Sequence, residues 1–85
     1  MGYVIVIRFG KGQVERTPLP EDARLDEAKE SALSCLKKLA SDGISAQAAE
    51  IENGQSVVVS SLTLSNLTAM EYLNLLEGGY LAAWS

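Results

Sequence analysis

The chain has 85 residues, of which 47 % are hydrophobic and 21 % are charged, and its formal net charge is −4. This aliphatic content excludes intrinsic disorder. Unbroken apolar runs such as residues 3–7 are far shorter than the roughly 20 residues of a membrane-spanning helix. The chain has no histidine and one cysteine, so the usual zinc and haem sites lack their ligands. We therefore expect a single domain, residues 1–85, that holds no metal and no other cofactor.

The first predicted element is a strand at residues 3–9, because these residues are mostly β-branched or aromatic and the run is short for a helix. Alternation places four large side chains on one face, which we assign to the core: Tyr3, Ile5, Ile7 and Phe9. The Gly-Lys-Gly sequence at 10–12 predicts a tight turn with positive φ angles. Residues 13–17 then alternate like a short, exposed return strand, which Pro18 ends because proline cannot donate to a sheet.

Residues 22–42 predict an amphipathic helix. At 100° per residue, its apolar side chains fall on one arc: Leu25, Ala28, Ala32, Leu33, Cys35, Leu36, Leu39 and Ala40. Acidic residues lie in the first turns and lysines in the last, as the helix dipole favours. Gly43 is placed to end the helix in the left-handed conformation.

The next two elements predict a β-hairpin. Residues 44–51 alternate with a change of phase, which a β-bulge near Ala48 and Ala49 would explain. Asn53 and Gly54 separate this strand from a second one at 56–64, and this pair of residues is typical of a type I′ turn.

A second helix is expected from Ser65 or Thr68 to Glu77. Thr68 and Glu71 have the spacing of a capping box, and two glycines follow the helix. Four side chains form its predicted inner stripe: Ala69, Tyr72, Leu73 and Leu76. Leu67 and Leu75 fall outside that stripe.

These elements predict a small α+β two-layer sandwich, with an antiparallel or mixed sheet of three or four strands and both helices on one face. The element order is ββαββα. If residues 13–17 form only a loop, the order is instead the βαββα of a ferredoxin-like domain that lacks its last strand, and residues 80–84 are then candidates for that strand.

Charge is distributed unevenly, because no basic residue follows Lys38. Such an acidic second half disfavours nucleic acid and anionic lipid as partners, since both are bound through Lys and Arg. It is either a solvated face or a surface that attracts a basic protein partner. The apolar run at 4–7 is too short for a secretory signal and leads directly into Arg8, so we expect a cytoplasmic protein.

Catalytic signals are weak. Cys35 has no histidine to activate it, and we expect a buried apolar role for it. Ser34 and Lys38 lie one turn apart on the solvated face of the helix, where the lysine keeps its charge and cannot act as a base. Glu50 and Glu52 share one face of a strand, but we expect solvated carboxylates there rather than a paired site. An enzyme is therefore not expected.

The C-terminal segment at 80–84 is apolar and follows a double glycine. It either folds back onto the core or forms an intermolecular patch with other apolar side chains. The residues that we single out for interaction are Tyr80, Leu81, Trp84, Leu75, Leu67, Glu50 and Glu52.

The leading hypothesis is a non-enzymatic protein–protein interaction module, dimerising with itself. One alternative is a small-molecule-binding regulatory domain of the ferredoxin-like type, with the ligand held between subunits near the turns at Gly10 and Gly43. A further alternative is a phage-type small inhibitor protein, since such proteins are similar in size and charge.

Overall fold

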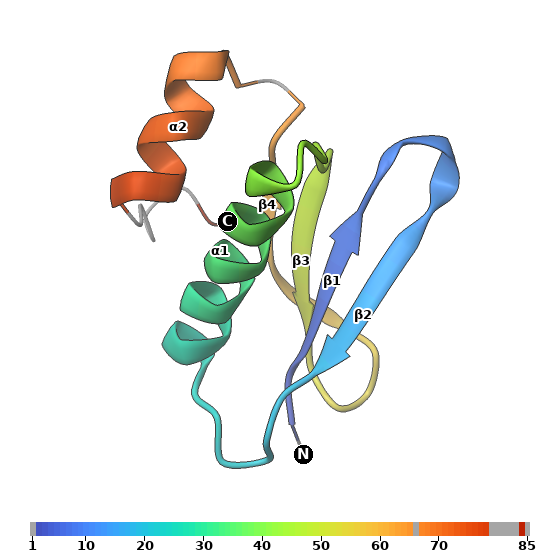
Figure 1. Ribbon diagram of the computed structural model, residues 1–85. Coiled ribbons are helices and arrows are strands. Elements are labelled where there is room, and N and C mark those ends of the chain that lie inside the picture. Colours follow the sequence, from blue (N-terminus) through green and yellow to red (C-terminus); the bar gives the residue numbers. More distant parts are fainter. Residues whose placement is uncertain (1, 66, 79–83, 85) are drawn as a thin grey trace.

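The computed structural model describes residues 2–65, 67–78 and 84. Along the chain the elements are β1 (Val4–Arg8), a 3-10 turn (Gly10–Gly12), β2 (Val14–Pro18), α1 (Leu25–Ser41), β3 (Ala48–Glu52), β4 (Val58–Thr63) and α2 (Ala69–Gly78). The strands form one antiparallel sheet in the order β2-β1-β3-β4, and both helices lie on the same side of it (Figure 1). The predicted α+β two-layer sandwich is confirmed, and ββαββα is the observed order because β2 pairs with β1.

The β1–β2 hairpin closes over the predicted glycine-rich turn. The Phe9 N–H donates to the Gln13 carbonyl at 2.9 Å. Lys11 and Gly12 adopt φ angles of 65° and 75°. Glycine reaches this left-handed region without cost, whereas Lys11 is strained by its Cβ.

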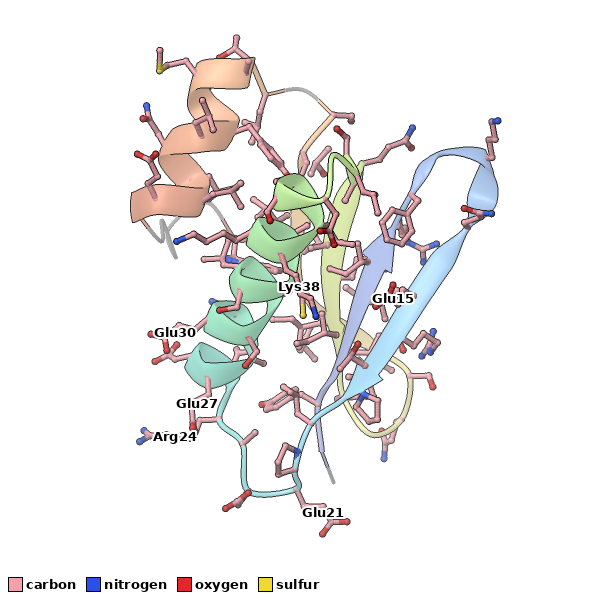
Figure 2. All side chains as sticks on the ribbon, in the orientation of Figure 1. Glu15, Glu21, Arg24, Glu27, Glu30 and Lys38 are labelled. Carbon is pink, nitrogen blue, oxygen red and sulfur yellow. The ribbon has the colours of Figure 1, made fainter. Side chains whose placement is uncertain are left out.

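Helix α1 begins at Leu25, later than the predicted Asp22, because residues 20–23 form a turn in which the Ala23 N–H donates to the Pro20 carbonyl. Its solvent-facing side carries Glu27, Glu30 and Lys38 (Figure 2). Its buried side packs on the sheet through Ala28, Ala32, Leu33 and Leu36.

The C-terminus of α1 is a Schellman motif. The Gly43 N–H donates to the Ala40 carbonyl and the Ile44 N–H to the Leu39 carbonyl, while Gly43 has a φ angle of 77°. The predicted left-handed glycine is therefore confirmed.

The strand predicted at 44–51 is shorter than expected. Residues 44–47 form the loop between α1 and β3, and β3 begins at Ala48. The register from Ala48 to Ile51 is continuous against both neighbouring strands, so the predicted bulge at Ala48 and Ala49 is wrong. The change of phase marks the boundary between loop and strand. The irregularity lies instead opposite the step from Ile51 to Glu52, where Val59 is the extra residue of β4.

The β3–β4 hairpin is confirmed, but its turn is not type I′. The Ser56 N–H donates to the Asn53 carbonyl, and the Asn53 N–H donates to the Val57 carbonyl. The residue with a positive φ angle is Ser56, at 62°, and not Asn53 or Gly54. This is the three-residue loop in which a type I turn is followed by one left-handed residue. The Asn53 Oδ1 stabilises it by accepting from the Gln55 and Val57 N–H groups.

Helix α2 has the predicted capping box. The Glu71 N–H donates to Thr68 Oγ1 at 3.2 Å, and the Thr68 N–H donates to Glu71 Oε1 at 3.1 Å. The predicted inner stripe is partly wrong, because Ala69 and Leu73 are exposed whereas Leu75 is buried. The helix is rotated about its axis so that Tyr72, Leu75 and Leu76 face inward.

The core lies between the sheet and the helices. Its buried members are Ile5, Ile7, Ala28, Ala32, Leu33, Leu36, Ala46, Ala49, Ile51, Leu62, Leu64, Leu75 and Trp84. Neither of the two described helices covers the opposite face of the sheet (Figure 1), which we call the helix-free face.

Candidate functional site

The two carboxylates proposed for interaction lie on the helix-free face of the sheet, and each is paired with an arginine. The Arg8 Nε donates to Glu50 Oε1 at 3.0 Å, and the Arg16 guanidinium pairs with Glu52. Glu52 is only 6 % exposed. The expectation of a solvated carboxylate is therefore wrong for Glu52, because Arg16 on the neighbouring hairpin covers and neutralises it.

The C-terminal candidates divide between the core and the part of the chain that is not described. Leu75 and Trp84 are buried within the single chain, at 3 % and 8 % exposure, and Leu67 packs against the same core. These three side chains pack in the core. They do not form the exposed patch for which the sequence suggested them. Tyr80 and Leu81 lie outside the described residues.

A different apolar surface is exposed at the start of β4. Val57, Val58 and Val59 are 54 %, 44 % and 42 % exposed. We call these three residues the valine patch. It lies at the end of the sheet that carries the β3–β4 turn, on an outer strand of the sheet.

The two outer strands differ in charge. Strand β2 carries Glu15, Arg16 and Pro18, residue types that discourage pairing of exposed strands between molecules. Strand β4 has neither charge nor proline. The sequence signal for this surface is the uncharged stretch from Asn53 to Met70, which would have located the patch better than the search for aromatic residues did.

A cavity of about 690 Å³ lies at the opposite end of the sheet. We call it the loop-end cavity. Its walls come from the β1–β2 turn, the last turn of α1, the α1–β3 loop, the β4–α2 loop and the first half of α2. The lining residues are Gly10, Ala40, Ser45, Ala46, Gln47, Leu64, Ser65, Leu67, Thr68, Ala69, Tyr72 and Leu73.

Tyr72 is the ionisable side chain among these lining residues. Burial raises the pKa of its hydroxyl above the ordinary value of 10.0, so the phenol is neutral at physiological pH. Its oxygen is buried, and no hydrogen-bond partner is found for it in the described structure. The loop-end cavity thus has an uncharged lining. Glu50 and Glu52 are not part of it.

The fold does not assemble a site from the remaining residues that were considered for catalysis. Cys35 is a free thiol and half-buried, and Ser34 and Lys38 are exposed on α1. Within the described ranges, no group of three or more Cys, Asp or Glu side chains is placed to hold a metal ion. Among the helices described, none has the length and apolar character needed to cross a membrane.

Comparisons of the chain with protein-family models, with curated proteins and with solved structures gave no match.

Proposed function

We propose that this protein is a non-enzymatic interaction module that associates with a second copy of itself through the valine patch. The observation that carries the proposal is the exposure of three consecutive valines, Val57 to Val59, at the beginning of an outer strand. Exposed apolar side chains lose contact with water when a partner covers them, and this is the main driving force of association.

The charge of the chain restricts where a second copy can bind. Each chain carries a net charge of −4, so two copies repel one another over most of their surfaces. Residues 53–59, which contain the β3–β4 turn and the valine patch, carry no charged side chain, so a second copy meets little repulsion there. Closed twofold dimers are also the commonest oligomers, and they bring the same patch of each subunit together.

The position of the acidic residues supports an apolar rather than an ionic contact. Glu50 and Glu52 are paired with Arg8 and Arg16 of their own chain. Using them to bind a basic partner would require these internal pairs to break. A contact through the valine patch breaks neither of these ion pairs.

Sedimentation velocity tests this proposal, with loading concentrations from about 10 µM to about 1 mM, where small interfaces associate. The native chain is expected to change from monomer to dimer over this range. Val57→Glu is expected to remain a monomer, because it places a charge in the contact. Thr63→Glu is the matched control, since it adds the same charge at an exposed position near the other end of β4, and it is expected to dimerise like the native chain.

Both variants are first shown to be folded by thermal unfolding. A native chain that stays monomeric at the highest concentration contradicts the proposal. Equal dimerisation of Val57→Glu and the native chain contradicts the assignment of the surface.

A further inference from the structure

We propose that the loop-end cavity binds a small, uncharged organic molecule that has a flat apolar body and an amide or hydroxyl group at one end. This function goes beyond self-association and uses the opposite end of the sheet. The valine patch lies beside the β3–β4 turn, whereas the cavity lies beside the β1–β2 turn and α2.

The size of the cavity fits a small molecule. Its volume of about 690 Å³ lies within the range of roughly 300–1,000 Å³ that is typical of ligand pockets. The space exists because four segments each contribute a residue with little or no side chain at this point: Gly10, Ala40, Ala46 and Ala69.

The apolar part of the lining defines the body of the ligand. Ala46 and Leu64 are nearly completely buried and belong to the core cluster, so the cavity reaches inward to the core. Tyr72 and Leu73 contribute an aromatic ring and an aliphatic side chain from α2. A flat ring is the shape that packs best against the face or edge of a tyrosine.

The polar part of the lining defines the group at the end of the ligand. Ser45, Gln47 and Ser65 are exposed lining residues from two loops. The Gln47 amide lies beside Gly10, since a Cβ added to Gly10 would be 3.4 Å from Gln47 Nε2. An amide and two hydroxyls offer both donors and acceptors, which suits an amide or a hydroxyl group of a ligand.

The charge of the lining excludes ionised ligands. None of the lining residues that the structure describes is Asp, Glu, Lys or Arg, and the Tyr72 phenol stays neutral because burial raises its pKa. A carboxylate or an ammonium group would lose water on entering and would find no opposite charge to replace it.

The test uses three probes of the same shape: benzamide, benzoate and benzylamine. They are titrated into the full chain at neutral pH while the backbone amides are followed by ¹H–¹⁵N NMR. Benzamide is expected to bind saturably, with a dissociation constant in the millimolar range, as is usual for so small a molecule. It is expected to shift the backbone amide signals of Ala46, Gln47, Ser65 and Ala69. Benzoate and benzylamine are expected to bind at least about tenfold more weakly.

Two variants of α2 locate the binding. Ala69→Leu fills the cavity from an exposed position at the start of the helix and is expected to weaken benzamide by about tenfold or more. Asn74→Leu adds leucine at an exposed position of the same helix that does not line the cavity, and it is expected to change the affinity by less than about twofold.

Three results overturn this inference: no saturable benzamide binding, equally strong binding of a charged probe, or an unchanged affinity in Ala69→Leu. Sedimentation of the same samples reports the proposed self-association separately, because Ala69 and Asn74 lie outside the valine patch. A failure of ligand binding is thus distinguished from a failure of dimerisation.

Discussion

Arg16 of β2 and Glu52 of β3 form an ion pair although β1 lies between their strands. In the register of the sheet, Arg16 is opposite Val6 and Glu52 is opposite Val4, so the arginine side chain extends diagonally over β1. Val6 faces away from the helices, yet it is 0 % exposed. Its cross-strand neighbours, Arg16 and Glu50, are both held in ion pairs, which explains how a valine on the helix-free face is kept from water.

We expect the two ion pairs to contribute unequally to stability. Removal of Arg16 leaves the carboxylate of Glu52, which is 6 % exposed, without its partner. Arg16→Ala is therefore expected to lower the free energy of unfolding by about 1–3 kcal/mol. Arg8→Ala is expected to lower it by no more than about 1 kcal/mol, because the side chain of Glu50 is more accessible to water than that of Glu52, at 19 % against 8 %. Urea unfolding at neutral pH measures both values.

A second change separates the charge of Glu52 from the packing of Arg16. In the Arg16→Ala background, Glu52→Gln removes the unpaired charge and is expected to restore part of the lost stability. If Arg8→Ala and Arg16→Ala lower the free energy of unfolding equally, or if Glu52→Gln restores none of the lost stability, the Arg16–Glu52 pair has no special role in stability.

The fold could be predicted where local chemistry decides the structure. The capping box of Thr68 and Glu71 and the left-handed Gly43 depend on residues close in the chain, and both are present as expected. The alternation of Ile5 and Ile7 likewise identified the buried face of β1. These features need no knowledge of distant contacts.

The candidate site could not be predicted in the same way, because it depends on contacts between distant segments. The pairing of Glu52 with Arg16 requires the strand order, and the burial of Leu75 requires the rotation of α2 against the core. The turn after Asn53 differs from the expected type because the hairpin has a three-residue loop, which moves the left-handed residue to Ser56. The loop-end cavity was not predicted, because the sequence suggested a ligand between subunits near Gly10 and Gly43, whereas this cavity lies within one chain and Gly43 is not among its lining residues.

Replacing Ser56, in the turn between β3 and β4, by glycine should make the protein more stable. Ser56 has a φ angle of 62°, where a Cβ costs free energy. Ser56→Gly is therefore expected to raise the free energy of unfolding by about 0.5–1 kcal/mol. Asn53→Ala is the opposite case, since it removes the acceptor for the Gln55 and Val57 N–H groups, and a loss of about 1 kcal/mol is expected. Thermal unfolding of the two variants checks both directions, and a destabilised Ser56→Gly would contradict this account of the turn.

Self-association through the valine patch should strengthen as salt is added. Each copy carries a net charge of −4, and salt screens the repulsion between copies while it leaves an apolar contact intact. Raising NaCl from about 20 mM to about 300 mM is expected to increase the association constant by about two- to fivefold. Sedimentation equilibrium measures this constant. A constant that falls with salt would indicate a contact made by ion pairs, and would therefore contradict the assignment to the valines.

The hydroxyl of Tyr72 should limit stability at alkaline pH. Burial raises its pKa above 10.0 in the folded chain, so between pH 10.0 and the raised value the unfolded chain loses this proton first, and stability falls as the pH rises. Tyr72→Phe removes this loss and is expected to be more stable than the native chain at about pH 10.5. At pH 7 it is expected to keep the native stability or to gain up to about 1 kcal/mol, because the buried oxygen has no partner in the described structure. Urea unfolding at both pH values compares the two proteins, which share all their other ionisable groups. A clear loss of stability in Tyr72→Phe at pH 7 would show that the hydroxyl is bonded in solution.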